Sequence, residues 1–324
     1  MNLVFLSFAV SFILTLLVKL VAQKNLLIDI PNERSSHSTP TPTGGGIAIA
    51  ITWFVAISYL KYIELLNSDL YWALLSGLII CVISLIDDIY EIKPLPRIII
   101  QTTSAIIALY FIGGLQQLDI GIYVLENELI LSLIAVLGIV WFVNLFNFID
   151  GIDGYAASET IFVAISMYFF INNIVLLVFA TCILGFLPWN WDKAKIFMGD
   201  VGSTLLGFTI CILAIYYNNI GEFPLINSII LTSLFWFDAT ITLLKRFINK
   251  ENLGKAHKKH AYQRIVASGF SHQKTVIIGM GINLLLFSIV LIIPNSSYAL
   301  VAFIFACLVL YGVYQSINNK QPFL

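Results

Sequence analysis

Residues 128–154 read ELILSLIAVLGIVWFVNLFNFIDGIDG, and this stretch decides the fold. Its first part, 128–146, is a nearly unbroken apolar run, whereas its end carries amides, carboxylates and glycines. A membrane-spanning helix needs about 20 consecutive apolar residues. The stretch is therefore typical of a transmembrane helix that ends in a polar motif at the membrane surface.

The rest of the chain repeats this pattern. The chain has 324 residues, of which 59% are hydrophobic and 11% charged, against about 25% charged in an average globular protein. Its mean hydropathy of +0.94 leaves too few polar residues to cover a soluble surface, which excludes two soluble domains. Apolar runs bounded by polar residues, Gly or Pro lie at 3–22, 45–62, 70–86, 98–114, 128–146, 157–171, 174–187, 201–217, 225–247, 275–293 and 298–316.

These runs predict an all-α, polytopic integral membrane protein with about 11 transmembrane helices. The first run lacks a basic start and a clear cleavage site, so we expect a retained helix and not a signal peptide. The boundary inside 157–187 is the least determined, because only Asn172 and Asn173 separate two short runs. One merged helix there would reverse the orientation of every later helix.

The basic residues decide the orientation. With the N-terminus outside, 16 of the 17 Lys and Arg residues fall on the cytoplasmic side and Lys61 alone falls outside, as the positive-inside rule requires. A merged helix at 157–187 would divide the basic loops between the two faces. We therefore expect the N-terminus outside, the C-terminus in the cytoplasm and one transmembrane domain over 1–324. Its cytoplasmic loops are expected at about 23–45, 87–97, 144–156, 188–201 and 248–274.

Two aspartates end the third apolar run. The segment LIDDIYEIKPLPR places Asp87 and Asp88 side by side, and adjacent ionised carboxylates repel unless a cation or a proton compensates them. Neighbours on a helix point about 100° apart. One carboxylate could therefore face a metal or substrate while the other faces Lys93 or Arg97; a solvated helix end is the alternative.

Two further acidic motifs follow. Asn147, Asp150 and Asp153 are spaced by three residues, which would put them on one face if the helix continued, and their oxygens suit a hard cation such as Mg²⁺. In FMGDVGS, Asp200 stands between two glycines at the start of a helix. The free N–H groups there could bind phosphate, or Asp200 could cap the helix.

Three other polar features lie on or near the cytoplasmic side. The loop 29–46 contains prolines and three consecutive glycines, which could approach a ligand closely or simply form a turn. The segment 245–265 is strongly basic and contains His257 and His260, which could hold phosphates or a uracil; a topology signal is the alternative. Asp238 lies inside the ninth helix, where a carboxylate usually lines a cavity or pairs with a cation. Together the aspartates and the basic loop suit a Mg²⁺–diphosphate substrate.

The motifs IDDIYEIKPLPR, NLFNFIDGIDG, FMGDVGS and HKKHAYQR, in this order, resemble the polyprenyl-phosphate N-acetylhexosamine-1-phosphate transferases of glycosyltransferase family 4. This superfamily includes the phospho-N-acetylmuramoyl-pentapeptide transferase. The resemblance implies transfer of an N-acetylhexosamine-1-phosphate (GlcNAc, or a deoxy or modified sugar) from a UDP-sugar donor to undecaprenyl phosphate. UMP would be released, and the lipid diphosphate-linked sugar would initiate a cell-surface polysaccharide such as O-antigen, capsule or teichoic acid.

The resemblance also implies roles for individual residues and a cofactor. It implies catalytic roles for Asp87, Asp88, Asp150 and Asp153; substrate binding by Asn144, Asn147, Lys93, His257, His260 and Arg264; and a metal ligand in Asp200, with Asp150 as a second candidate. The implied cofactor is Mg²⁺, or Mn²⁺ in its place. The resemblance further implies a location in the bacterial inner membrane with the active site on the cytoplasmic face. It implies no nucleic-acid partner and is compatible with a homodimer.

The chain departs from the family pattern at two places. The consecutive histidines of the peptidoglycan enzyme are replaced by the pattern from His257 to Arg264, which is closer to the O-antigen and capsule initiators. Thr43 stands where several relatives carry a basic residue, which leaves the role of the first loop open.

Two other functions remain to be distinguished from the transferase. A transporter would explain many helices and an intramembrane Asp238, but transporters place their polar residues near the membrane midplane, whereas these aspartates lie at helix ends. An inactive scaffold of the same fold would tolerate alanine at the motif aspartates.

Overall fold

The apolar runs form helices throughout the chain. The structure is a computed structural model and describes residues 2–24, 27–31, 39–90, 92–253, 257–294 and 296–323. Its helices are α1 (Asn2–Lys24), α2 (Gly46–Tyr62), α3 (Ser68–Leu75), α4 (Gly77–Tyr90), α5 (Pro94–Ile112), α6 (Glu128–Ile149), α7 (Tyr155–Ile171), α8 (Ile174–Asn190), α9 (Gly199–Asn219), α10 (Leu225–Leu231), α11 (Ser233–Ile248), α12 (Ala261–Ala267), α13 (His272–Ile292) and α14 (Ala299–Lys320), with a 3₁₀ turn at Ser296–Tyr298.

The predicted class, a helical polytopic membrane protein, is confirmed. Within the described residues, seven helical segments are long and apolar enough to cross a membrane, and the bent pair α10–α11 would make an eighth. The apolar helices α2, α7 and α8 have 17 residues each, at the lower end of the length a bilayer requires. Eleven crossings and an outside N-terminus stay predictions.

The predicted boundary at Asn172–Asn173 is confirmed. Asn172 takes the left-handed conformation, with φ of 55°, and ends α7. The Asn173 side chain then accepts a hydrogen bond from the N–H of Val175 and so caps α8. Asparagine tolerates the left-handed region better than most residues and is a favoured N-cap. Two helices therefore replace one, and they pack against each other.

The run 225–247 was expected to be one helix, and this expectation is wrong. α10 and α11 are bent by 75° at Thr232. Thr232 and Ser233 donate their hydroxyls back to the carbonyls of Ser228 and Ile230, and such bonds bend helices. The run 70–86 likewise divides at Ser76, into α3 and α4, but the two helices remain one candidate span.

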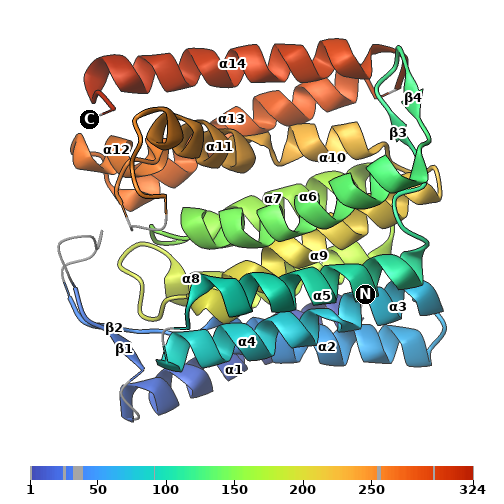
Figure 1. The fold of residues 1–324 in the computed structure, drawn as a ribbon. Coiled ribbons are helices and arrows are strands. Elements are labelled where there is room, and N and C mark those ends of the chain that lie inside the picture. The colour runs from blue at the N-terminus through green and yellow to red at the C-terminus, as the bar shows by residue number, and fades with distance from the viewer. Residues whose placement is uncertain are drawn as a thin grey trace.

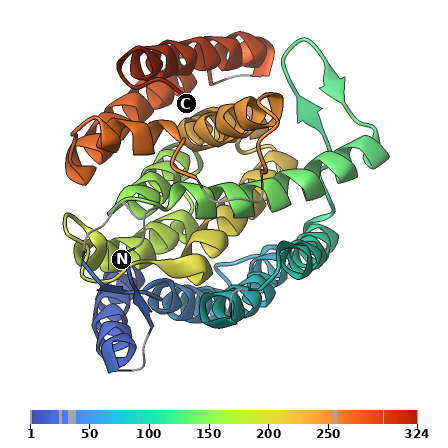
Figure 2. The same ribbon diagram turned by 60° about the vertical axis from the view of Figure 1, so that its left-hand side comes forward.

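The long helices lie side by side (Figures 1 and 2), with α1 and α2 at one side of the bundle and α13 and α14 at the other. Two antiparallel hairpins lie at opposite ends of the bundle: β1 (Ile28–Asp29) with β2 (Thr41–Pro42), and β3 (Leu118–Asp119) with β4 (Val124–Leu125). α12 and the C-terminal end of α14 lie at the end of the bundle that carries β1 and β2. This end also carries the acidic motifs.

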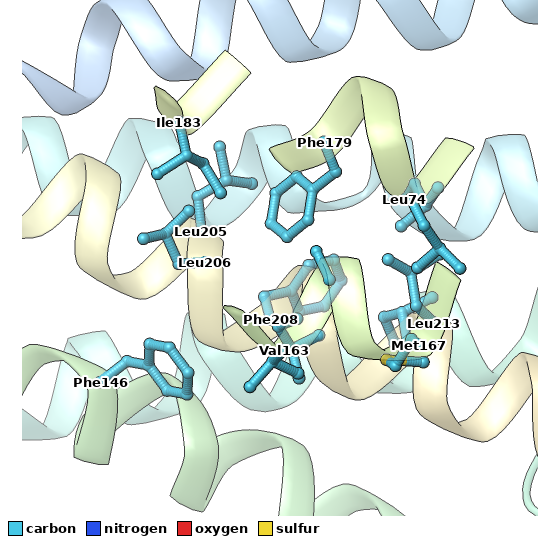
Figure 3. Packing of buried hydrophobic residues seen from close by; sticks show 14 of the residues in the cluster. Leu74, Phe146, Val163, Met167, Phe179, Ile183, Leu205, Leu206, Phe208 and Leu213 are labelled. Carbon is cyan, nitrogen blue, oxygen red and sulfur yellow. The ribbon is translucent and has the colours of Figure 1, made fainter. Parts of the chain in front are cut away.

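α9 is the central helix and packs against α2, α4 and α6. Its side chains Leu205 and Phe208 are fully buried, together with Phe146 of α6, Val163 of α7 and Phe179 of α8 (Figure 3). Because helices on several sides enclose it, the first turn of α9 is held in place at the acidic end of the bundle.

A glycine allows α1 and α8 to approach closely. A Cβ atom at Gly185 would lie 2.5 Å from the carbonyl oxygen of Phe8 and 2.7 Å from the Cβ of Ser11. Small residues at helix contacts are typical of membrane proteins, where packing replaces the hydrophobic effect as the cause of association. By contrast, a Cβ atom at Gly138 of α6 would meet no atom within 4 Å.

We expect Gly185→Ala to destabilise the protein by about 1–3 kcal/mol, because backbone atoms of α1 would have to move. Thermal unfolding of the purified protein in detergent measures the change. Gly138→Ala is the matched control and should leave the unfolding midpoint unchanged or raise it, since alanine favours the helix. Equal midpoints for the two variants would show that the α1–α8 contact is not close.

Candidate active site

The end of α4 meets the start of α9 through Asp88. The N–H of Asp200 donates to Oδ1 of Asp88 over 3.1 Å. Oδ2 of Asp88 is buried and has no hydrogen-bond partner among the described residues. Gly199 has φ of +75°, and a Cβ atom there would lie 3.1 Å from this same oxygen. Glycine at this position therefore places no side chain against Oδ2 of Asp88, and we call this buried, unpartnered atom the open oxygen of Asp88.

Arg97 of α5 binds two of the carboxylates. Its Nη1 pairs with Oδ2 of Asp87, and its Nη2 lies 3.4 Å from Oδ2 of Asp200. Asp87 also accepts the N–H of Ile92 over 2.6 Å. One of the paired aspartates was predicted to face Lys93 or Arg97, and Asp87 does face Arg97. Lys93 is exposed at the N-cap of α5.

The end of α6 brings an amide and a third carboxylate to the same place. The Asn147 amide hydrogen-bonds to the carboxylate of Asp200. Asp150 is the C-cap of α6. Burial, together with the charges of Asp200, Asp153 and Asp88, raises the pKa of Asp150 to about 7. The acidic motifs of α4, α6 and α9 thus form one cluster.

Asp153 does not share a helix face with Asn147 and Asp150 as a continuing helix would require, because α6 ends at Ile149. Its Oδ2 lies 3.3 Å from Nδ1 of His272 and accepts the N–H of Ala194 over 3.1 Å. Burial alone would raise the pKa of Asp153, but these hydrogen bonds outweigh it, and the pKa is lowered. His272 was not predicted to take part in the site, and the one sequence feature that could have indicated it is its position just before the apolar run 275–293.

Asn144 lies one turn before Asn147 and faces α5. Its amide donates to Oε1 of Gln101 and to the carbonyl of Val140, both over 2.7 Å. These bonds join α6 to α5, so the structure gives Asn144 a packing contact, while Asn147 reaches the cluster.

Asp238 contacts the start of α12 and lines a cavity beside it, which is one of the two roles expected for it. It accepts the N–H groups of Ala261 and Tyr262 over 2.7 and 3.4 Å, and Nδ1 of His260 lies 3.7 Å away. The hydroxyl of Thr242 donates to it as well. A carboxylate inside the bundle therefore fixes the end of the basic loop, residues 249–260, that connects α11 to α12.

Tyr262 joins α12 to the acidic cluster. Its hydroxyl donates to the carbonyl of Phe148 over 3.1 Å, and a Cβ atom at Gly151 would lie 2.1 Å from this hydroxyl. Residues 150–154 therefore lie directly beside α12, and the basic loop adjoins the carboxylates.

The two predicted histidines of the basic loop lie together, with ring centroids 4.9 Å apart. Burial, followed by the neighbouring His260 and Arg246, lowers the pKa of His257 to about 4. His257 is therefore neutral at pH 7 and can donate a hydrogen bond but adds no charge. Lys255 lies outside the described residues.

Arg264 faces away from the cluster. Its Nη1 donates to Oδ1 of Asn318 and to the carbonyl of Gln321 over 3.2 and 3.0 Å, and its guanidinium lies over the ring of Tyr314. Residues two apart on a helix point about 200° apart, so Tyr262 and Arg264 occupy opposite faces of α12. The structure places the predicted substrate-binding Arg264 against α14.

Two of the three glycines of the first loop, Gly45 and Gly46, pack against the backbone of residues 197–202. The N–H groups of Gly45 and Gly46 donate to the carbonyls of Phe197 and Met198, and a Cβ atom at Gly46 would lie 2.2 Å from the nitrogen of Gly202. Gly45 and Gly46 thus approach the residues around the start of α9 closely, and the approach to a ligand stays a prediction. Residues 32–38 of the loop, including Arg34, lie outside the described residues.

The carboxylates fit a magnesium ion if they supply some of its ligands and the phosphates of a substrate supply the others. In the described part of the chain, no group of three or more His, Cys, Asp or Glu residues could hold a metal by itself. Mg²⁺ is usually bound by one or two carboxylates together with substrate phosphates and water. The open oxygen of Asp88 beside Asp200 and Asp150 matches that donor set.

Comparisons with known proteins agree with this arrangement. The family model described as "Glycosyl transferase family 4" matches residues 70–218. A probable undecaprenyl-phosphate N-acetylglucosaminyl 1-phosphate transferase of Bacillus subtilis is 31% identical over 280 residues, covering 82% of this chain and 77% of its own. An undecaprenyl-phosphate alpha-N-acetylglucosaminyl 1-phosphate transferase of Thermotoga maritima is 25% identical, covering 85% of each chain. A phospho-N-acetylmuramoyl-pentapeptide-transferase of Thermotoga petrophila is 30% identical over 205 residues, covering 60% of this chain and 68% of its own.

We expect Asp150→Asn to stabilise the protein more at pH 8 than at pH 5. Between the ordinary aspartate pKa of 3.8 and about 7, this carboxyl is ionised in the unfolded chain but protonated in the folded protein. The folded state then binds more protons, so the wild type loses stability as the pH rises through that window. Asparagine removes the loss. Thermal unfolding at both pH values, in EDTA, measures the difference.

Asp69→Asn is the matched control, because Asp69 is exposed at the start of α3, at the opposite end of the bundle. Its effect should be the same at both pH values. An equal effect of Asp150→Asn at pH 5 and pH 8 would contradict the raised pKa.

Proposed function

The chain belongs to glycosyl transferase family 4, and from this premise we propose that it transfers an N-acetylhexosamine-1-phosphate from a UDP-sugar to undecaprenyl phosphate. UMP leaves, and a lipid diphosphate-linked sugar forms that initiates a cell-surface polysaccharide. The observation that carries the proposal is the meeting of three acidic helix ends around the open oxygen of Asp88.

The donor we favour is UDP-N-acetylglucosamine, with deoxy or modified N-acetylhexosamines as the next candidates. The relatives from Bacillus subtilis and Thermotoga maritima are named for N-acetylglucosaminyl 1-phosphate transfer. The basic loop lacks the consecutive histidines of the peptidoglycan enzyme, which supports this choice over a muramoyl-pentapeptide donor.

The reaction exchanges one phosphorus–oxygen bond for another. An oxygen of the lipid phosphate attacks the β-phosphorus of the donor, and the bond from that phosphorus to the bridging oxygen breaks. The bridging oxygen leaves with its electron pair as part of UMP. A phosphate monoester is already largely ionised at pH 7, since its second pKa is about 6. The residues therefore have to position and shield charges more than to remove a proton.

Asp88 is the aspartate that we assign to the lipid phosphate. Asp87 is held by Arg97 and by the N–H of Ile92, whereas one oxygen of Asp88 has no partner in the described chain. Asp88 can take the remaining proton of the phosphate or share a cation with it. Asp87 then acts as a positioning residue that keeps Arg97 beside Asp200.

Asp200 is the proposed magnesium ligand, with Asp150 as the second. Bound there with the donor, Mg²⁺ would neutralise the diphosphate and the charge that develops on UMP; Mn²⁺ would serve in its place. The Asn147 amide contacts the Asp200 carboxylate. Asp150, with its raised pKa, has to lose its proton before it can contribute a ligand.

The basic loop supplies the donor side of the site. Tyr262 holds the loop against residues 148–151, which brings His257 and His260 near the carboxylates. Neutral His257 would donate one hydrogen bond to the nucleotide. Lys93, exposed at the start of α5, is placed to meet a phosphate arriving from solution.

We place this site on the cytoplasmic face of the bacterial inner membrane, in one transmembrane domain. With the N-terminus outside, 16 of the 17 basic residues lie on the side of the acidic cluster, in accordance with the positive-inside rule. UDP-sugars are cytoplasmic substrates, which supports the same side.

The transporter hypothesis fits less well. The carboxylates gather at helix ends, and Asp238 is occupied by the start of α12. Activity that persists after ion gradients collapse would argue against transport. An inactive scaffold of the same fold would tolerate substitution of the motif aspartates, so the variants that test the enzyme also test this alternative.

We expect Asp200→Asn to lower UMP release about 10²- to 10³-fold, the typical cost of losing one group that stabilises charge in the transition state, because the variant would hold the proposed Mg²⁺ less well. The assay combines purified protein, undecaprenyl phosphate and UDP-N-acetylglucosamine with Mg²⁺ or EDTA. Asparagine keeps the shape of the side chain, so folding should survive. The exposed Asp69→Asn is the control and should retain wild-type turnover.

Full activity of the Asp200→Asn variant would show that Asp200 is not a magnesium ligand. Wild-type protein that is folded but releases no UMP with any UDP-N-acetyl sugar would contradict the proposed reaction.

His272 should act as a positioning residue. Its Nδ1 holds the turn 150–154 through Asp153, so His272→Ala should lower kcat about 10- to 100-fold with less change in KM. His272→Asn places an amide near the position of Nδ1, where its oxygen can accept the N–H of Asp153 or its nitrogen can donate to the Asp153 carboxylate, and should restore much of the loss. A purely structural role would lower the unfolding midpoint equally in both variants without this difference in kcat.

A further inference from the structure

A cavity of about 270 Å³ lies between α11, α12, α13 and α14. Its walls are largely apolar and include Phe237, Ile265, Ile278, Ile282 and Leu310. On α14 the lining extends from Leu310 to Lys320, which is about 15 Å at 1.5 Å per residue. The cavity is therefore long enough for a stretch of acyl chain that runs along the helices.

One end of this cavity carries a buried cation with unused donors. Arg264 is 4% exposed and lines the cavity. Its Nη1 binds α14, but its Nε and Nη2 have no hydrogen-bond partner within the described ranges. The hydroxyl of Tyr314, 3% exposed, also lacks one. Buried donors without acceptors cost free energy, so this end is suited to an anion.

The charges around Arg264 favour the same ligand. Lys320 lines the cavity, and Nζ of Lys245 lies 4.7 Å from the centroid of the Tyr314 ring. Asp238 also lines the cavity, but its oxygens accept the N–H groups at the start of α12. A positive end joined to an apolar channel matches an anionic headgroup joined to an acyl chain.

We propose that this cavity binds one anionic phospholipid, with its phosphate at Arg264 and an acyl chain beside α13 and α14. The proposal goes beyond the transfer reaction, because the site is distinct from that of the lipid acceptor. Tyr262 forms the wall toward the acidic cluster and donates to Phe148, whereas Arg264 points to the opposite side of α12. A lipid bound here would hold α12, and through it Tyr262, in place.

Native mass spectrometry of the full-length protein tests the proposal. The protein is equilibrated with vesicles of phosphatidylglycerol or of phosphatidylcholine and then released into detergent. We expect one phosphatidylglycerol per chain, retained at least about tenfold better than phosphatidylcholine. Arg264→Gln should lose this preference, whereas Lys274→Gln should keep it. Lys274 is an exposed cation at the start of α13 that does not line the cavity.

Two further variants separate binding from folding, since Arg264 also anchors α14. Tyr314→Phe removes one unpaired hydroxyl without changing the shape and should weaken retention of the lipid severalfold. Ile282→Trp should fill the chain end of the cavity and abolish retention. Leu284→Trp, on the exposed face of α13, is its control and should not.

Three results would overturn the proposal. Equal retention of the two phospholipids would show no anion site. Complete displacement of phosphatidylglycerol by inorganic phosphate would show a headgroup pocket that takes no chain. One-for-one displacement by undecaprenyl phosphate would assign the cavity to the acceptor.

Discussion

Arg97 joins two helix ends that would otherwise repel each other. Its guanidinium contacts Asp87 at the end of α4 and Asp200 at the start of α9, and the N–H of Asp200 completes the contact by donating to Asp88. An aspartate costs roughly 2.5–3.5 kcal/mol at the centre of a membrane helix, and less toward its ends. The bundle keeps these carboxylates because they lie at helix ends and share one cation. Burial, and after it the remaining negative charge of the cluster, raises the pKa of Asp150.

The features that the sequence could predict depend on short stretches of chain. Each apolar run was long enough to identify a helix, and Asn172 and Asn173 were sufficient to divide α7 from α8. The meeting of the aspartates followed from their places at run ends on one side of the membrane. Arg97 lies ten residues from Asp87, close enough in sequence to be predicted as its partner.

The features that could not be predicted depend on contacts between distant segments. The bend between α10 and α11 contains neither Pro nor Gly, and it is stabilised by hydroxyls that bond back to the chain. Asp153 turns away because α6 ends before it and His272, 119 residues later, is beside it. The direction of Arg264 depends on α14, more than 50 residues further on. The spacing of residues within one motif does not determine the bend, the position of Asp153 or the direction of Arg264.

The short helix α12 connects the acidic cluster with α14. Asp238 accepts an N–H at its start. Tyr262 hydrogen-bonds to the end of α6 from one face of the helix, and Arg264 hydrogen-bonds to the carbonyl just after α14 from the other. The acidic cluster has no three-residue metal site of its own among the described residues, so in the proposed reaction the phosphates of the donor complete the coordination of the cation. On that proposal the donor binds first, because the cation bound with it lets Asp88 and Asp200 accept the lipid phosphate without repulsion. Tyr262 contacts residues 148–151 from the end of the basic loop, so a shift of α12 would act on that step.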